Sequence, residues 1–327
     1  MMHLNKKLRL EKKNQNNFFD DLHDDLIISI LRKLSSSASS PSDFLTVLLT
    51  CKRLNRLGLH PLVLSKAGTH TLAVTLEKWS DSSHKFLKLC VNAGNINACY
   101  ALGMIRFYCL QNQVSGASLM AKAAIKSHAP ALYALSVIQF NGSGGSKSDR
   151  NLRAGVALCA RSAYLGYVDA LRELGHCLQD GYGVPRDVSE GRRLLIQANA
   201  RELASSLRSY LSLKAGNEIL TDLSVPVQEI HPVNRFLKDW FGSGRVELAE
   251  GLRMCSHDGC GRPETRPHEF RRCSVCGKVN YCSRGCQALD WRAKHKVECT
   301  PLDLWVAVVE EIGDGEAVEI DDNHGER

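Results

Sequence analysis

Eight side chains that can bind a soft metal ion lie within forty-five residues of this 327-residue sequence. They are seven cysteines and one histidine in four close pairs: Cys255 and Cys260, Cys273 and Cys276, Cys282 and Cys286, His295 and Cys299. Thiolate and imidazole groups suit zinc, and a structural zinc site fills all four tetrahedral positions with protein atoms. Eight ligands therefore predict two structural zinc ions, with no open position for a catalytic water.

A disulfide framework is the alternative for a cluster of this kind. A secreted framework favours an even number of cysteines and a signal peptide, whereas this cluster has seven cysteines and a histidine. The two-residue gap in Cys273–Cys276 is typical of a zinc knuckle. The last two pairs are each four residues apart, so both members of a pair would share one face of a helix over residues 283–298. These four side chains cannot all face one ion.

Residues 254–300 closely resemble the MYND zinc finger in the order of their cysteines and in the residues Gln287 and Trp291 between the last pairs. The resemblance implies two interleaved sites, with Cys255, Cys260, Cys282 and Cys286 on one zinc ion and Cys273, Cys276, His295 and Cys299 on the other. Four residues separate the members of the first pair, where the family usually has two, so His257 is an alternative to Cys260. Thiolates are the usual ligands of such sites and favour Cys260.

The same resemblance implies a module that binds short proline-containing peptides, with Gln287 and Trp291 in its groove. The alternative role for Trp291 is core packing in a small domain. Both roles are compatible, because an aromatic ring partly buried beside a metal can still present an edge to a proline ring.

The composition is that of an intracellular protein with two or more domains. The sequence has no apolar run of membrane-spanning length, and its basic first residues lack the apolar core of a signal peptide. The basic segment, residues 3–13, is a nuclear address or a solvated tail, so we expect the nucleus or the cytoplasm, with the nucleus slightly favoured. The net charge of +7 combines a basic body with an acidic end, and we expect no membrane partner and no nucleic-acid partner. Six further cysteines are expected in the core, as in a reducing compartment: Cys51, Cys90, Cys99, Cys109, Cys159 and Cys177.

Residues 18–62 show apolar side chains at helical spacing on both sides of a serine-rich break at residues 35–42. Ser42 or Asp43 can cap the second helix, and Phe44, Val47 and Leu48 begin an apolar stripe that continues to Leu54.

The segment from residue 20 to about residue 62 resembles an F-box, although His23 stands where proline is usual and the loop between the helices is long. The resemblance implies docking on the Skp adaptor, and through it on a cullin, in an SCF-type ubiquitin ligase. It implies these contact residues: Leu22, Leu26, Ile27, Ile30 and Leu31. The alternative is an amphipathic helix pair with no adaptor role.

The middle of the chain repeats. Residues 98–103, 131–136 and 170–175 align at steps of 33 and 39, and Gly116, Gly155 and Gly191 open the matching second halves. A period in the thirties, with small residues at fixed helical offsets, predicts an α-solenoid of paired helices. Residues 91–215 resemble Sel-one-like tetratricopeptide repeats, which implies a surface for a target protein; the alternative is a spacer.

No enzyme motif stands out in the sequence. The loop at residues 142–148 fails as a phosphate cradle, because Ser146 stands where a P-loop needs glycine, and it aligns with the turn at residues 181–187 instead. There is no nucleophile elbow, and the repeats leave no room for a methyltransferase domain.

We therefore expect a mainly α protein in seven parts. These are a basic tail (1–17), the F-box (18–62), a helical connector (63–90), the solenoid (91–215), a connector (216–250), the finger (251–300), and a short apolar segment followed by an acidic disordered tail (301–327). In the second connector, Phe236, Leu237, Trp240 and Phe241 are expected to pack on another element. The predicted function is a non-enzymatic substrate-recognition adaptor of an SCF-type ligase. A zinc-finger corepressor or scaffold is the alternative.

Overall fold

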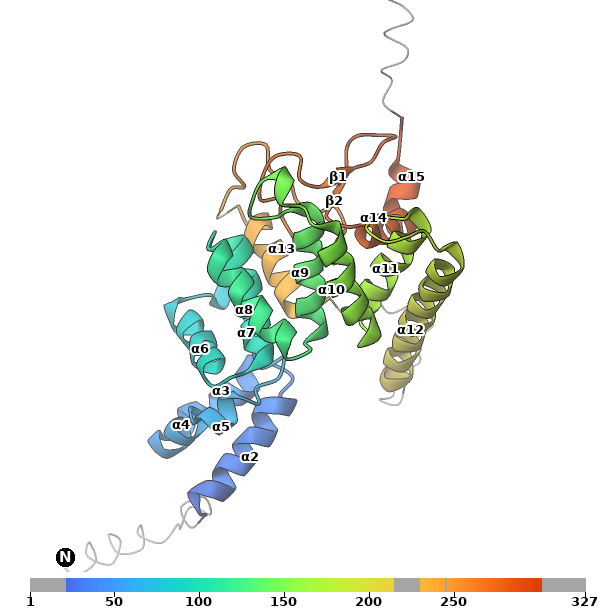
Figure 1. Ribbon diagram of the computed structural model, residues 1–327. Helices are drawn as coiled ribbons and strands as arrows, with labels where there is room; N and C mark the ends of the chain where they lie inside the picture. Colours follow the sequence, from blue (N-terminus) through green and yellow to red (C-terminus); the bar gives the residue numbers. More distant parts are fainter. Residues whose placement is uncertain (1–21, 215–229, 245, 302–327) are drawn as a thin grey trace, which may run out of the picture.

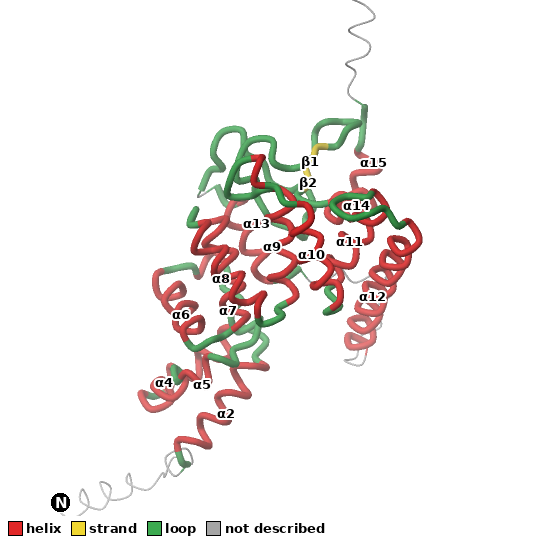
Figure 2. Tube along the Cα trace, in the orientation of Figure 1, coloured by secondary structure: helices red, strands yellow, loops and turns green. Residues whose placement is uncertain are grey.

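The computed structural model describes residues 22–214, 230–244 and 246–301. The described part is built from helices, apart from one short antiparallel ladder in the finger (Figures 1 and 2). This confirms the mainly α prediction. The tail at residues 1–17, the apolar segment at residues 302–309 and the acidic end lie outside the described residues. None of the described helices is both long and apolar enough to cross a membrane.

The N-terminal unit consists of four helices around a small core. They are α2 (Asp24–Ser37), α3 (Pro41–Thr50), α4 (Lys52–Gly58) and α5 (Pro61–Leu64). The core side chains come from every helix: Ile27, Leu31, Ala38, Phe44, Leu48, Leu57 and Val63. Arg53 ties α4 to α2 by an ion pair with Asp24 at 2.7 Å.

Two details of this unit differ from the sequence prediction. The predicted serine-rich break is mostly helix, because α2 continues to Ser37, and the cap of α3 is Ser40 instead of Ser42 or Asp43. Ser40 and Asp43 form a reciprocal capping box, and Pro41 occupies the first helical position, where its missing N–H costs nothing. The second predicted helix is also divided, since Cys51 is extended and starts α4, which places Leu54 in a separate helix.

The solenoid follows in order along the chain. Its helices are α6 (Asp81–Asn92), α7 (Ile96–Met104), α8 (Gln113–Ile125), α9 (Ala129–Asn141), α10 (Leu152–Tyr164), α11 (Val168–Asp180) and α12 (Val188–Lys214). A π-helical turn extends α7 over Ile105–Cys109, and 3₁₀ turns occur at Leu76–Lys78 and Lys147–Asp149. Successive helices pack side by side (Figure 1). Helix α6 falls in the predicted connector at residues 63–90, but its Leu87 and Cys90 are buried in the same core as α7 and α8.

Glycines let paired helices approach closely, as the repeat pattern predicts. A Cβ atom on Gly116 would lie 2.7 Å from the Gly103 carbonyl oxygen, and one on Gly191 would lie 2.7 Å from the Gly175 carbonyl oxygen. Contacts this short leave no room for a side chain. In the middle repeat the ring of Phe140 fills the corresponding space beside Gly155.

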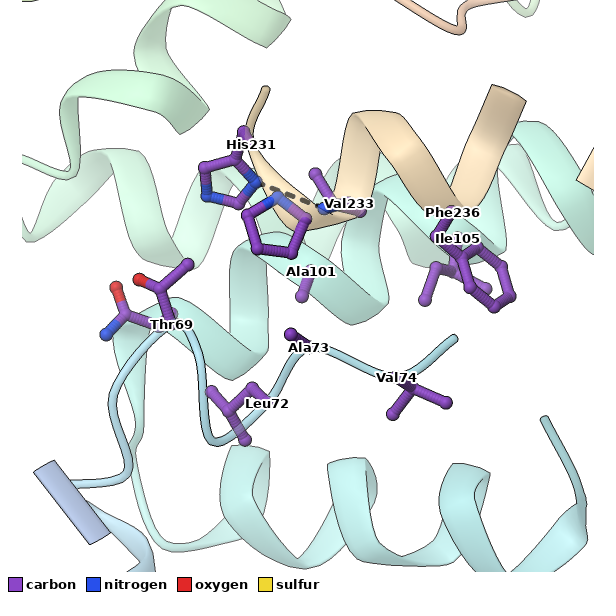
Figure 3. Close-up of a pocket in the computed structure, with 11 residues that line it drawn as sticks. Thr69, Leu72, Ala73, Val74, Ala101, Ile105, His231, Val233 and Phe236 are labelled. Carbon is purple, nitrogen blue, oxygen red and sulfur yellow. Dashed lines mark hydrogen bonds between the residues drawn. The ribbon is translucent and has the colours of Figure 1, made fainter. Parts of the chain in front are cut away.

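Helix α13 (Pro232–Gly242) packs across the first repeat. Its Val233, Phe236 and Leu237 are buried in the core that contains α7 and α8. Figure 3 shows the start of α13 facing α7 and the segment from Thr69 to Val74, around a small cavity of about 20 Å³. The second predicted connector therefore contains a helix that belongs to the solenoid, as its apolar residues suggest.

Candidate metal centre

The structure brings all eight predicted ligands together in two clusters. Cys255, Cys260, Cys282 and Cys286 form the inner cluster, and Cys273, Cys276, His295 and Cys299 form the outer cluster. Within each cluster the ligand atoms lie within 4.8 Å of one another. The grouping is the interleaved one that the sequence resemblance implies.

The spacing of these atoms fits tetrahedral zinc. In the inner cluster, the Sγ atom of Cys282 lies 3.5 Å from Cys260 Sγ and 3.6 Å from Cys286 Sγ. In the outer cluster, Cys276 Sγ lies 3.5 Å from His295 Nε2. A tetrahedron with zinc–sulfur bonds of about 2.3 Å has edges of about 3.8 Å, whereas a disulfide bond is about 2.05 Å. All thirteen cysteines of the chain are free. Two zinc ions fit the clusters, and a disulfide framework does not.

Two of the cluster cysteines, Cys260 and Cys273, favour the thiolate over the thiol. Burial acts to raise the pKa of Cys273, but hydrogen bonds from the Cys276 backbone and the His295 ring outweigh it and bring the pKa to about 6. Hydrogen bonds from neighbouring cysteines hold the pKa of Cys260 well below its usual range. Cys90, which belongs to neither cluster, has its pKa raised to about 12 by burial alone. Zinc binds the deprotonated form, so Cys260 and Cys273 are suited to bind it. Hydrogen bonds with Cys255 and Cys260 raise the pKa of Cys282 and Cys286 instead, so these two thiols must lose their protons when the ion binds.

Short elements position the ligands. The ladder of β1 (Arg271–Arg272) and β2 (Asn280–Tyr281) brings Cys273 and Cys276 to the outer cluster. Ser283 caps α14 (Arg284–Asp290), which carries Cys286. A π-helical turn (Trp291–His295) and α15 (Lys296–Glu298) continue to the outer cluster. The predicted helix at residues 283–298 therefore exists with a π-helical turn in its second half.

Cys260, and not His257, joins the inner cluster. Arg262 lies against this cluster. Its side chain is buried, and its guanidinium donates a hydrogen bond to Cys260 Sγ at 3.3 Å. Four thiolates around one zinc ion carry a net charge of about −2, so a buried guanidinium balances part of it. His257 is not among the ligand atoms of that cluster and lines a neighbouring cleft.

The inner cluster is part of the solenoid core. Cys255, Cys260, Cys282 and Cys286 share one buried cluster with Tyr133, Val137 and Phe140 of α9 and with residues of α10 to α12. The outer cluster takes no part in that core, and its Cys299 is half-exposed. The finger lies across the ends of α9, α10 and α11 (Figure 1). It is docked on the repeats instead of following them as a separate module.

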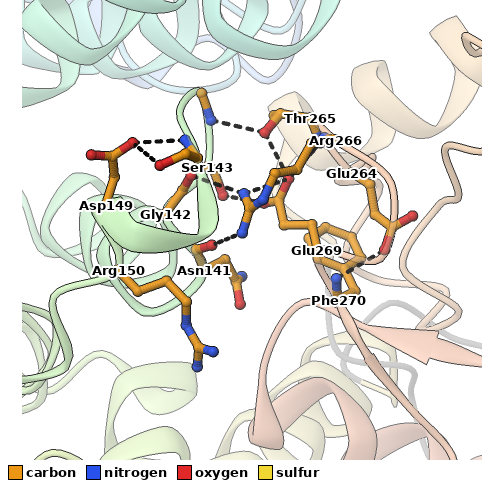
Figure 4. A network of polar contacts seen from close by, with 12 residues as sticks. Asn141, Gly142, Ser143, Asp149, Arg150, Glu264, Thr265, Arg266, Glu269 and Phe270 are labelled. Carbon is orange, nitrogen blue, oxygen red and sulfur yellow. Dashed lines mark hydrogen bonds and ion pairs between the residues drawn. The ribbon is translucent and has the colours of Figure 1, made fainter.

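A polar network ties the finger to the turn after α9 (Figure 4). The guanidinium of Arg266 donates to the carbonyl oxygens of Asn141 and Gly142, at 2.5 and 2.9 Å. The Gly144 amide donates to Thr265 Oγ1 at 2.8 Å, and the Ser143 hydroxyl donates to the buried carboxylate of Glu269. The loop that fails as a phosphate cradle is therefore a docking site for the finger.

A second contact joins α11 to the start of α14. The carboxylate of Glu173, which is buried, accepts hydrogen bonds from the amides of Gly285 at 2.6 Å and Arg284 at 3.3 Å. The Arg284 guanidinium pairs with Asp180 at 2.8 Å and lies 3.5 Å from the centre of the Tyr182 ring. The carboxylate thus completes the cap of the helix that carries Cys286.

These contacts were not predicted, although the amino-acid sequence contains a signal for them. In the aligned repeats Arg172 and Glu173 replace Tyr133 and Ala134, so the third repeat has two charged residues at buried positions. Charged residues are rarely fully buried unless they are paired. Arg172 pairs with Glu202 of α12, and Glu173 with the finger.

Glu173→Ala is expected to destabilise the chain by about 1–3 kcal/mol, because it leaves buried helix N–H groups without an acceptor. Chemical denaturation of the zinc-loaded protein would measure this. Glu190→Ala is the matched control, since Glu190 pairs with Arg193 on the exposed surface of α12 and should change stability by less than about 0.5 kcal/mol. Equal effects of the two variants would contradict a docking role for Glu173.

The predicted peptide and adaptor residues have different environments. Trp291 is 43% exposed and its ring lies edge-on to His295 at 5.7 Å, while Gln287 is half-buried. Of the five predicted adaptor contacts, Leu26 and Ile30 are 55% and 48% exposed, and Leu22 is half-buried. Ile27 and Leu31 are 1% and 2% exposed inside the core of their own unit. In this structure they present almost no surface to a partner, and their role as adaptor contacts stays a prediction.

Three family models match the chain. They are plant tetratrico peptide repeats at residues 71–167, the Sel1 repeat at residues 168–201 and the MYND finger at residues 255–299. The chain is 88% identical to F-box protein At5g50450 of Arabidopsis thaliana, over 100% of both chains. It is 61% identical to F-box protein At1g67340 of the same plant, over 93% of this chain and 86% of that protein. A solved antigen of uropathogenic Escherichia coli with an SLR fold is 17% identical, with a TM-score of 0.43, over 68% of this chain and 46% of that one.

Proposed function

The chain belongs to the family of the F-box proteins At5g50450 and At1g67340 of Arabidopsis thaliana, and from this premise we propose that it is a substrate-recognition adaptor of an SCF-type ubiquitin ligase. The N-terminal unit docks on a Skp-type adaptor and, through it, on a cullin. The repeats and the finger bind the target protein. The role is non-enzymatic and belongs inside the cell, in the nucleus or the cytoplasm.

The observation that carries this proposal is the similarity to proteins named for an F-box over the whole chain. The form of the N-terminal unit supports it. Six large apolar side chains in the described part of this small unit are exposed to solvent: Leu26, Ile30, Leu45, Leu49, Leu59 and Leu62. Exposed apolar side chains on a unit of this size favour a protein partner. In Figure 1 the unit and the finger lie at opposite ends of the molecule, an arrangement that would keep adaptor and target apart.

Co-purification tests the proposal. The full-length chain, expressed with a Skp-type adaptor and a cullin, is expected to form a stable complex with both. A chain lacking residues 1–62 should bind neither, yet should still hold two zinc ions. If the full-length, zinc-loaded chain does not retain the adaptor, the ubiquitin-ligase role is wrong. A corepressor or scaffold role would then be the better proposal.

Trp291→Ala is expected to keep both zinc ions and to lower the affinity for a proline-containing peptide by more than about tenfold. The reason is that Trp291 is exposed and is no zinc ligand, and truncating a tryptophan anchor commonly costs about 2 kcal/mol or more. Elemental analysis and fluorescence polarisation would measure the two quantities. Val297→Ala, at an exposed apolar position of α15, is the control for peptide affinity. Loss of zinc from the Trp291 variant would show that its packing on His295 is structural.

A further inference from the structure

An open cleft of about 630 Å³ lies where the repeats, α13 and the finger meet. Its walls include Thr69 before the solenoid, Asp169 at the start of α11, Asn234 at the start of α13, His257 in the first loop of the finger and Leu289 of α14. A cleft of this size is typical of ligand sites, which often lie between domains. It exists only because the finger is docked on the repeats.

The cleft is rich in hydrogen-bond acceptors. Asp169, Asp258 and Asp290 line it, and among the described residues no lysine or arginine does. Its basic side chains are His70, His231 and His257, while Arg172 and Arg262 line a smaller cavity that shares Asp169 and Asn234 with it. Asp258 is already paired with two lysines at 3.2 Å, and Asp290 accepts the Tyr281 hydroxyl at 2.7 Å. Asp169 makes no ion pair within the part of the chain that the structure describes.

Burial raises the pKa of Asp169 above its usual range. A hydrogen bond with Tyr167 and the charges of Arg262 and His257 act in the opposite direction without overcoming this effect. A cation brought into the cleft would stabilise this carboxylate in its charged form.

A buried amide points to the same kind of ligand. Asn234 is 8% exposed, and its Nδ2 donates to the Gly259 carbonyl oxygen at 3.1 Å. This bond fixes the orientation of the amide and leaves Oδ1 without a hydrogen-bond partner among the described residues. A buried acceptor without a donor is unfavourable, so a ligand that donates a hydrogen bond here is favoured.

The remaining walls suit a planar cation flanked by apolar groups. The ring of Tyr167 is held against Tyr133, with centroids 5.5 Å apart, and it faces the cleft together with Val168, Pro232 and Leu289. A guanidinium is planar, offers five N–H donors and stacks on aromatic rings, whereas an ammonium group does not stack in this way.

We propose that this cleft binds an arginine of a target protein's peptide, whose guanidinium donates to Asp169 and to Asn234 Oδ1 and lies against the ring of Tyr167. Apolar residues beside the arginine contact Val168, Pro232 and Leu289. The inference rests on the proposed function, since it takes the ligand to be the target of the adaptor. The acidic residues at 310–327 have the wrong charge to occupy this cleft.

Four octapeptide libraries test the proposal against the full-length, zinc-loaded chain. Each library has one fixed central residue, arginine, lysine, glutamine or glutamate, and mixed residues elsewhere. The arginine library is expected to bind at least about tenfold more tightly than the glutamine library, with lysine between them and glutamate weakest. Equal binding of all four, or a preference for glutamate, would overturn the proposal.

Two variants locate the site. Asp169→Asn should reduce the affinity for the arginine library to that for the glutamine library. Ala293→Tyr, at an exposed position on the finger side of the cleft, should block all binding there without disturbing a buried residue. Asp239→Asn is the matched control, because it removes an exposed aspartate of α13 that lies outside the cleft. Zinc content and thermal unfolding confirm that each variant is folded.

The outcomes separate this inference from the proposed function. An arginine preference that survives both Asp169→Asn and Ala293→Tyr would refute the cleft as its site. If Asp169→Asn does not fold, Ala293→Tyr alone decides. Co-purification with the Skp-type adaptor, measured on the same preparations, depends on the N-terminal unit and reports on the ligase role by itself.

Discussion

Replacing Cys282 with serine is expected to reduce the zinc content from two ions per chain to one and to destabilise the repeats together with the finger. Cys282 belongs to the inner cluster, which shares its buried core with α9 to α12. Structural zinc contributes about 10–16 kcal/mol to the folding of small fingers, and a site with three thiolates loses much of it. Elemental analysis and thermal unfolding followed by circular dichroism would measure both effects.

Cys276→Ser should lose one zinc ion as well, but with a smaller effect on the repeats. Its cluster is the outer one, which takes no part in the solenoid core. Cys177→Ser is the matched control, because Cys177 is buried in the same core as Cys282 but binds no metal. It should keep two zinc ions at a modest cost in stability. If Cys276→Ser and Cys282→Ser destabilise the repeats equally, the distinction between inner and outer clusters is wrong.

The double variant Leu26→Asp/Ile30→Asp is expected to abolish binding of the Skp-type adaptor while the chain stays folded. Both side chains are about half-exposed, so charges there are tolerated in the free protein. In a complex, the same charges would be buried without partners. One lost anchor side chain costs about 2 kcal/mol or more, which is about a thirtyfold loss in affinity, and two together remove detectable binding.

The control for this experiment is Leu89→Asp, which places the same charge at a half-exposed leucine of α6, outside the N-terminal unit. It should bind the adaptor like the unchanged chain. Circular dichroism and zinc content establish that both variants are folded. Undiminished adaptor binding by the folded double variant would mean that α2 is only one helix of an N-terminal bundle, and the scaffold alternative would gain.

These expectations depend on the orientation of α2, which periodicity leaves open. Leu26, Ile27, Ile30 and Leu31 form one broad apolar stripe, and the sequence predicts the stripe as a whole. Packing against α4 and α5 divides it, since Ile27 and Leu31 enter the core while Leu26 and Ile30 remain outside. Residue type does not separate the two groups, because a side chain buried in its own unit and a side chain that contacts a partner protein are both apolar.

The amino-acid sequence by itself determined the eight metal ligands, the two-ion count and the paired helices of the repeats. These features are local, because ligand chemistry depends on residue type and short spacing, and helix pairing depends on small residues at a fixed period. Ser40 was missed as a cap because six serines stand near the break, and any of them has the required hydroxyl.

Only the tertiary structure decided that the finger docks on the repeats. The contacts of Glu173 with Gly285 and of Asn141 with Arg266 join residues more than a hundred positions apart in the chain. The cleft is also made this way, since Asp169, Asn234 and Leu289 come from three different elements. No spacing rule relates such residues. They meet because burying the inner cluster against α9 to α11 removes apolar surface from water, and that gain depends on the shape of both surfaces together.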